Sequence, residues 1–126
     1  AMLPAIQPSA SRFGVTASLP FLPAGIPITG MAGDQQAALF GQGAFRSGEA
    51  KCTYGTGAFF LVHTGERPIR SRHRLLSSLA ATTSAKPEFV LEGSVFIAGA
   101  AVQWLRDGLH LLAKSSDVES LAARSD

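Results

Sequence analysis

Asp34 is the only charged residue in a stretch rich in glycine and glutamine, GMAGDQQAALFGQ, which spans residues 30–42. It follows an apolar segment that we predict to be extended, and it precedes a predicted helix over residues 35–44. A carboxylate in that position can take a proton from a substrate hydroxyl, and the amide of Gln35 can donate to and accept from a polyol. The alternative is that Asp34 only caps the helix and gains from its dipole, and the spacing by itself favours this alternative.

A threonine flanked by glycines forms a second candidate, in TYGTG at residues 53–57. We predict strands over residues 50–54 and 58–62, joined by a hairpin turn in which glycine supplies a positive φ. Such a turn exposes backbone amides and the hydroxyl of Thr56, which together can bind a phosphate group. An ordinary hairpin turn is the alternative, because an isolated GxG pattern is weak evidence for a phosphate site.

Small residues open a third candidate, AGAAVQWL at residues 98–105. The periodicity predicts a helix over residues 98–112, on which Gln103 shares a face with Gly99, four residues earlier. Small side chains at a helix start let a ligand approach the backbone closely. They also permit tight packing of a helix on a sheet, which is their commoner use and remains the alternative. We interpret Trp104 as a core residue and His110 as a structural one.

The remaining elements must position these three stretches. Five prolines in residues 1–28 predict loops and short extended pieces with little structure of their own. Further strands are predicted over residues 75–82 and 89–96. The capping-box spacing of SDVE, residues 116–119, predicts the start of a last helix. This order of elements is typical of an α/β architecture, and the change in sequence style suggests a domain boundary near residues 43–49.

The composition restricts the function classes. Of 126 residues, 46% are hydrophobic and 16% are charged, which favours a folded chain over a disordered one. A net charge of +2 does not argue for a nucleic-acid partner. We therefore interpret the arginine-rich residues 67–74 as a solvated loop, with a phosphate or nucleic-acid contact as the weaker alternative. No apolar run approaches the roughly 20 residues of a membrane span.

The single cysteine, Cys52, excludes an intrachain disulfide and fits a reducing cytoplasm. We interpret it as a small buried residue of a strand. His63, His73 and His110 have no carboxylate or cysteine at ligand spacing, so we expect no metal site within this chain. Because the net charge is low and no apolar run is long enough to span a membrane, the expected partners include neither a membrane nor a nucleic acid.

The strings GDQQAALFGQ, KCTYGTGAFFLVHTG and LEGSVFIAGAAVQWLRDGL occur in this order and together resemble the glycerol kinases of the FGGY carbohydrate kinase family. The resemblance runs from about Met2 to the end and is strongest between Gly30 and Asp107. It implies an α/β fold that is part of a ribonuclease-H-like architecture of the actin and hexokinase type, with antiparallel hairpin strands followed by a helix. Residues 1–45 would end the N-terminal FGGY kinase domain, and residues 46–126 would begin the C-terminal one.

The resemblance also implies roles for single residues on the substrate side. Asp34 matches the base that removes a proton from the terminal hydroxyl of glycerol as it attacks the γ-phosphate of ATP. Gln35 matches a residue that hydrogen-bonds glycerol, and Phe59 matches an aromatic that packs on its carbon chain. Phosphoryl transfer depends mainly on such positioning and on neutralisation of charge.

On the nucleotide side, the resemblance implies that ATP is bound by residues of the turn and of the helix start, namely Gly55, Thr56, Gly99 and Gln103. ATP and Mg²⁺ are the implied cofactors, with the Mg²⁺ ligands mostly outside this chain. The family's phosphate loop, its adenine-binding segment and further glycerol ligands are also absent from these residues. Residues 19–24 lack the arginine of the loop that binds fructose 1,6-bisphosphate in bacterial glycerol kinases, which puts that regulation in doubt.

Two alternatives remain beside a glycerol kinase segment that is inactive alone. One is a non-catalytic remnant that self-associates through uncovered apolar faces, as its low charge suggests. The other is a kinase for a related polyol, because most of the substrate contacts of the family lie outside these residues.

Overall fold

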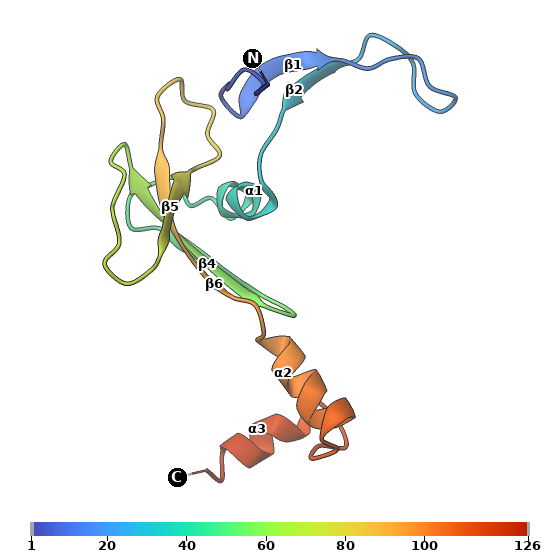
Figure 1. The fold of residues 1–126 in the computed structure, drawn as a ribbon, viewed down its shortest axis with the longest axis vertical. Coiled ribbons are helices and arrows are strands. Elements are labelled where there is room, and N and C mark those ends of the chain that lie inside the picture. The colour runs from blue at the N-terminus through green and yellow to red at the C-terminus, as the bar shows by residue number, and fades with distance from the viewer. Residues whose placement is uncertain (1, 126) are drawn as a thin grey trace. The chain divides into compact units, whose positions relative to one another are not determined.

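The computed structural model describes residues 2–125, which form six strands and several short helices (Figure 1). In chain order these elements are β1 (Ala10–Val15), β2 (Pro27–Gly30), α1 (Asp34–Gly41), β3 (Ala50–Tyr54), β4 (Ala58–Gly65), β5 (Leu76–Leu79), β6 (Phe89–Val95), α2 (Gly99–Gln103), the π-helix η1 (Trp104–Gly108) and α3 (Asp117–Ala122). The chain divides into two compact units, each of which is described by itself. Unit 1 comprises Ala1–Lys51 and Leu61–Glu92, and unit 2 comprises Cys52–Phe60 and Gly93–Asp126.

The proline-rich start of unit 1 is more ordered than predicted. β1 and β2 pair as an antiparallel hairpin with an irregular register between Ala10 and Gly14. The loop between them is held by Thr16, whose hydroxyl donates to the carbonyl of Pro23 at 2.7 Å and accepts the amide of Ile26 at 3.1 Å. The prolines do not disrupt the pairing, because they lie outside the strands or, for Pro27, at the first position of one.

Helix α1 was predicted from Gln35 to Ala44 but begins one residue earlier and ends at Gly41. Its N-cap is Gly33, whose extended backbone (φ −63°, ψ 149°) leaves the carbonyl free to accept the amide of Ala37 at 2.8 Å. Gly43 ends the helix because it adopts a left-handed φ of 76°, which a residue with a side chain rarely does. Asp34 is therefore a helical residue, and the prediction that it is the N-cap was wrong.

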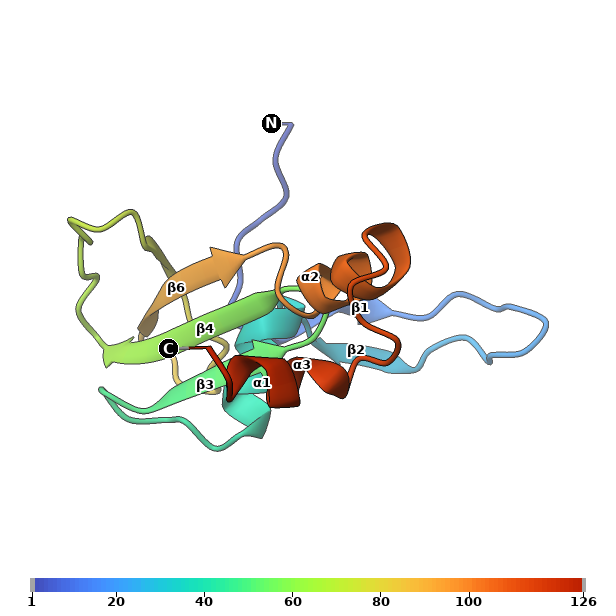
Figure 2. The same ribbon diagram turned by 90° about the horizontal axis from the view of Figure 1, so that it is seen from below.

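The predicted strands are confirmed, although β5 is shorter than expected. They form one four-stranded sheet in the order β3-β4-β6-β5. Figure 2 shows β4 between β3 and β6. β5 pairs antiparallel with β6, with Leu76 opposite Glu92 and Leu79 opposite Phe89.

The core of unit 1 lies between α1 and these strands and consists of five buried apolar residues: Leu39, Ala44, Leu61, Ala80 and Val90. Leu39 is the residue of α1 that is fully buried, and it packs in the same cluster as Leu61 and Val90 of the sheet. Burial of such side chains stabilises the fold by about 1.5–3 kcal/mol each. The rest of α1 remains accessible, including its first residue.

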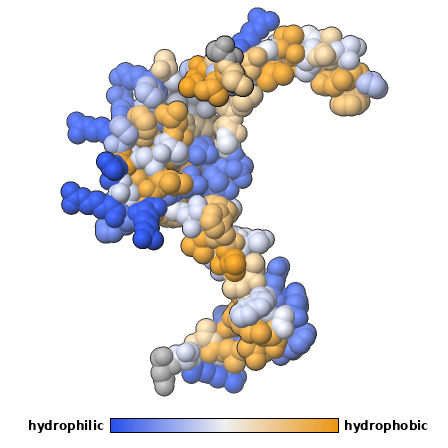
Figure 3. Space-filling model, in the orientation of Figure 1, coloured by the Kyte–Doolittle hydropathy of each residue, from blue (hydrophilic) through white to orange (hydrophobic). Residues whose placement is uncertain are grey.

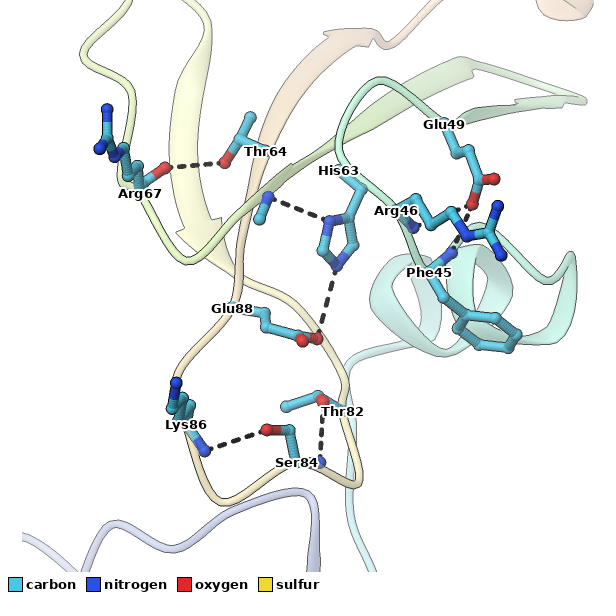
Figure 4. Close-up of polar contacts among 11 residues, drawn as sticks. Phe45, Arg46, Glu49, His63, Thr64, Arg67, Thr82, Ser84, Lys86 and Glu88 are labelled. Atoms are coloured by element: carbon cyan, nitrogen blue, oxygen red, sulfur yellow. Dashed lines mark hydrogen bonds and ion pairs between the residues drawn. The ribbon is translucent and has the colours of Figure 1, made fainter.

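A polar cluster surrounds His63, which is 3% exposed (Figure 4). Its Nδ1 accepts the amide of Gly65 at 3.1 Å, and its Nε2 lies 3.5 Å from a carboxylate oxygen of Glu88. This carboxylate could not be assigned to His63 from local spacing, because 25 residues separate the two. The pairing holds β4 against the segment that leads into β6, so we interpret His63 as a structural residue.

In unit 2 the predicted continuous helix over residues 98–112 is wrong. α2 ends at Gln103, and the backbone then widens into η1, where the amide of Leu109 donates to the carbonyl of Trp104 at 3.0 Å. A Cβ at Gly108 would lie 2.8 Å from the ring of Trp104, so the wide turn depends on glycine there. His110 follows with a left-handed φ of 53° and is exposed, and it is not part of a helix.

Two burial predictions in unit 2 are also wrong. Trp104 is 58% exposed and is not a core residue, and Cys52 lies on a strand but is exposed. The apolar surface of the α2–α3 region is visible in the space-filling view (Figure 3). Among the described residues of unit 2, Leu112 is the one large hydrophobic residue that is buried. Most of the large apolar side chains of this unit are therefore accessible.

The last helix, α3, begins at Asp117 as predicted, but without a capping box. Ser116 makes no side-chain cap hydrogen bond, and Asp117 instead accepts the amide of Lys114 at 2.8 Å. None of the helices in residues 2–125 has the length and apolar character that crossing a membrane requires.

Candidate functional site

The carboxylate of Asp34 is exposed at the first position of α1. The positive end of the helix dipole favours a negative charge there. The side chain accepts one hydrogen bond, from Nε2 of Gln35 to Oδ2 at 3.2 Å. Its remaining lone pairs face accessible space, so Asp34 is placed where a hydroxyl group can reach it.

Gln35 is half-buried and is held from the other side by Lys51 of β3. The ammonium of Lys51 donates a hydrogen bond to Oε1 of Gln35. Unit 1 thus contains a chain of donors that runs from Lys51 through Gln35 to Asp34. No local sequence signal indicates Lys51, because the contact joins residues that are 16 positions apart, on β3 and α1.

The turn after β3 is built from backbone hydrogen bonds within unit 2. The amide of Gly55 donates to the carbonyl of Gly57 at 2.8 Å. The carbonyl of Thr56 accepts the amides of Ala98 and Ala100 at 2.8 and 3.1 Å, which ties the turn to the start of α2. These bonds fix the turn and leave Thr56 itself exposed.

The glycines of this turn and of α2 have different neighbours. A Cβ at Gly99 would lie 2.5 Å from the carbonyl oxygen of Gly55, and one at Gly57 would lie 2.7 Å from that of Val95. Gly99 also donates its amide to Gly55 at 2.9 Å. Tight packing, the alternative weighed from the sequence, therefore accounts for Gly99. A Cβ at Gly55 would meet no atom within 4 Å, so the space beside Gly55 is open.

Two further predicted residues lie in unit 2. The ring of Phe59 is half-buried and meets Phe96 edge to face, with centroids 6.5 Å apart. Gln103 is exposed at the last position of α2. The predicted residues thus fall into two groups, with Asp34 and Gln35 in unit 1 and the others in unit 2.

Two carboxylates outside these groups have a lowered pKa. The amides of Arg46 and Phe45 donate to Glu49, and the bond from Arg46 is the larger cause of the low pKa of this carboxyl (Figure 4). Arg106 likewise lowers the pKa of Asp107 by hydrogen bonding to it, at 2.6 Å from Nε to Oδ1. Among the described residues, no three His, Cys, Asp or Glu side chains are grouped so as to hold a metal ion.

The sheet, the turn and the helix that follows are the parts of the molecule that a comparison with known families recognises. Residues 50–126 match the FGGY family of carbohydrate kinases, C-terminal domain. The chain therefore belongs to the FGGY family of carbohydrate kinases.

Within this family, the chain is similar to glycerol kinases. It is 55% identical to the glycerol kinase of Bdellovibrio bacteriovorus over 127 residues, which is 100% of this chain and 26% of that protein. It is 58% identical to the glycerol kinase of Alkalilimnicola ehrlichii over 122 residues, or 97% of this chain and 24% of that protein. The chain thus spans about a quarter of the length of these relatives.

Solved structures agree with this assignment. The crystal structure of Plasmodium falciparum glycerol kinase with ADP matches 94% of this chain and 24% of that one, with a TM-score of 0.80 and 39% identity. Xylulose kinase from Rhodospirillum rubrum matches 95% of this chain and 25% of that one, with a TM-score of 0.72 and 23% identity. The second likeness indicates the fold alone.

Proposed function

We propose that this chain is the segment of an ATP-dependent glycerol kinase that carries the catalytic base, and that it is inactive by itself. The observation that carries the proposal is the exposed carboxylate of Asp34 at the start of α1, in a chain 55% identical to a glycerol kinase. The N-cap of α1 is Gly33, so Asp34 does not hold the capping position, and the hydrogen bond that its side chain accepts comes from Nε2 of Gln35. The carboxylate is therefore available to a substrate.

In the proposed reaction, Asp34 accepts the proton of a terminal hydroxyl of glycerol while the oxygen attacks the γ-phosphorus of ATP. The bond from the γ-phosphorus to the bridging oxygen breaks, and its electron pair leaves with ADP. The products are glycerol 3-phosphate, ADP and the proton, which Asp34 returns to solvent. Gln35 hydrogen-bonds a glycerol hydroxyl, and Phe59 packs on the carbon chain.

ATP is proposed to bind at the turn and the start of α2 in unit 2, through Gly55, Thr56, Gly99 and Gln103. The open space beside Gly55 and the exposure of Thr56 support a phosphate contact there. The amide of Gly99 already donates to the carbonyl of Gly55. We therefore propose that Gly99 does not donate to ATP and that it contributes by letting the turn at Gly55 lie close to the start of α2.

Mg²⁺ is proposed to accompany ATP, with its ligands mostly outside this chain. The described residues contain no group of three metal-binding side chains. Mg²⁺ commonly uses one or two carboxylates together with phosphate oxygens. None of the roles proposed for the residues of this chain depends on a metal contact.

The fold-level part of the proposal is that residues 1–45 end one FGGY kinase domain and residues 46–126 begin the next. Both would be ribonuclease-H-like, as in actin and hexokinase. The match to the C-terminal FGGY domain over residues 50–126 supports the second half of this division. A cytoplasmic location is part of the proposal and rests on the single cysteine.

A non-catalytic, self-associating chain is the second candidate, favoured by one observation in unit 2. Ile97, Ala100, Ala101 and Trp104 line an almost wholly apolar recess, and the side chain of Trp104 is 58% exposed. Exposed apolar patches of this kind are typical of surfaces that another chain covers. Light scattering of the 126-residue chain tests this candidate, because a monomer at high concentration would exclude it.

The kinase proposal is tested with a chimera in which this chain replaces the matching 26% of the Bdellovibrio bacteriovorus glycerol kinase. A coupled assay would measure ADP release with glycerol and with longer polyols. We expect turnover with glycerol to exceed turnover with the other polyols, and we expect D34N to lower it by about 10²–10⁴-fold. Preference for a longer polyol would favour the related-kinase alternative, and full turnover by D34N would exclude Asp34 as the base.

A further inference from the structure

Lys51 is 6% exposed, although lysine is rarely buried without a partner. Its ammonium donates a hydrogen bond to Oε1 of Gln35 in the same unit. Removing an ammonium from water is costly unless hydrogen bonds compensate. The chain also contains Lys86, which is 71% exposed at its side chain and pairs with Glu66 on the surface. Lys51 thus differs from Lys86 in being buried, and Gln35 is one of its hydrogen-bond partners.

The contact restricts the orientation of the Gln35 amide. Lys51 can only donate hydrogen bonds, and the carboxylate of Asp34 can only accept them. With its oxygen toward Lys51, Gln35 directs Nε2 at Oδ2 of Asp34, 3.2 Å away. In the flipped amide, Nε2 would face the ammonium of Lys51, so that a donor meets a donor. Oε1 would face the carboxylate of Asp34, so that an acceptor meets an acceptor. The two neighbours thus select the same orientation of the amide.

We propose that Lys51 is a positioning residue that orients Gln35 for substrate binding, an inference that rests on the glycerol kinase function proposed above. In this orientation the second N–H of Gln35 is left for an oxygen of the substrate, while the free lone pairs of Asp34 accept from the reacting hydroxyl. The pair therefore binds a substrate that carries an acceptor oxygen close to the hydroxyl being phosphorylated. Lys51 touches neither reactant and acts through the amide.

The charge of Lys51 contributes to the same arrangement. Hydrogen bonds from a charged donor are stronger than those between neutral groups. The ammonium polarises the Gln35 amide, which strengthens the N–H donors at its other end. A neutral side chain at position 51 would leave Gln35 free to rotate away from Asp34.

The test compares K51M in the chimera with the matched control K86M, which makes the same chemical change at the exposed lysine. We expect K51M to raise the KM for glycerol about tenfold, in line with the loss of the one hydrogen bond that the Gln35 amide donates to the substrate. The KM for ATP should stay within about twofold, since Lys51 does not act on the nucleotide. K86M should resemble the unmodified chimera. An unchanged KM for glycerol in folded K51M would overturn the proposal.

A double-mutant cycle separates positioning from general stabilisation. In a Q35A background, K51M should raise the KM for glycerol by less than about twofold, because the amide that Lys51 orients is gone. A purely structural lysine would instead give the same increase in both backgrounds, which would contradict the proposal. Should K51M fail to fold, K51A takes its place in the cycle, because it also removes the donor to Gln35, and the same two outcomes decide.

The outcome for Lys51 is separable from that for the kinase function. Turnover of the unmodified chimera and its loss in D34N test the function alone. If the chimera is inactive, amide signals of Gln35 in nitrogen-15 NMR spectra of the 126-residue chain still test the inference. We expect both side-chain N–H resonances to be displaced from the positions of a free glutamine amide, and to move to those positions in K51M but not in K86M. Resonances that are identical in K51M and the unmodified chain would refute the orientation by Lys51.

Discussion

The start of α1 in unit 1 and the turn before β4 in unit 2 carry predicted site residues by different physical means. At α1 the chemistry resides in side chains, because Asp34 is exposed and Gln35 is oriented by Lys51. At the turn it resides in the backbone, which is held by amide–carbonyl bonds between residues 55–57 and the start of α2. The start of α1 should therefore be sensitive to replacement of the functional side chains themselves, and less sensitive to changes in the backbone around them. The second should be intolerant of any added Cβ where the backbones meet.

The largest effect on stability is expected from G99A. Its Cβ would lie 2.5 Å from the carbonyl oxygen of Gly55, so the turn and α2 must separate. Overpacking of this kind costs about 1–3 kcal/mol, which thermal unfolding of the chain would detect. The control is G41A, where a Cβ meets no atom within 4 Å and φ is ordinary, so stability should not fall. Equal unfolding temperatures for G99A and the unmodified chain would contradict the close packing.

G55A is expected to act on the ligand and not on the fold. A Cβ at this position would meet no atom within 4 Å, so the folded turn can accept the methyl group. If a phosphate of ATP approaches this backbone, the methyl group should raise the KM for ATP of the chimera about tenfold, the loss of roughly one charge-assisted contact. The KM for glycerol and the unfolding temperature should stay as they are. A KM for ATP that does not change would remove Gly55 from the proposed nucleotide contacts.

The smallest effect is expected from E49Q, which tests the backbone bonds that precede β3. The amides of Arg46 and Phe45 lower the pKa of Glu49 in the folded chain below the ordinary value of 4.5. The carboxylate therefore stabilises the fold above that ordinary pKa, and this contribution is lost as the pH falls through the lower, folded pKa. The unmodified chain should unfold at a higher temperature than E49Q at pH 7, and the difference should shrink below about pH 4.5.

E92Q is an unsuitable control for this experiment because Glu92 lies in the sheet. E119Q on the exposed face of α3 is better matched, since Glu119 is exposed and lies outside unit 1. A stability difference between E49Q and the unmodified chain that does not depend on pH would show that the carboxylate charge is not responsible.

Local sequence signals were sufficient for the strands of the four-stranded sheet and for the helix starts. Alternation and glycine punctuation predicted β3, β4 and β6, and α1 follows from the small and apolar residues after Gly33. The hairpin of β1 and β2 was missed, because its pairing depends on residues that flank a long proline-containing loop. Periodicity alone could not reveal the widening of the helix after Gln103, which depends on the fit of Gly108 to Trp104.

The candidate site was predictable where its signal lies in adjacent residues. Asp34 and Gln35 stand together in the sequence, and the structure adds their hydrogen bond. Lys51 was not predictable, because a buried lysine in a strand has the same local pattern as an exposed one. The exposure of Cys52, its neighbour on β3, was missed for the same reason, since alternation does not say which face is covered.

The central claim is that Asp34 acts in the chemical step, and rapid-quench single-turnover kinetics of the chimera test it most directly. With saturating ATP and glycerol, D34N should slow transfer of the γ-phosphate by about 10²–10⁴-fold, the usual contribution of a general base. Calorimetry should find that D34N still binds ATP as tightly as the unmodified chimera. Transfer at an unchanged rate in D34N, with the fold intact, would contradict the assignment of Asp34 as the base.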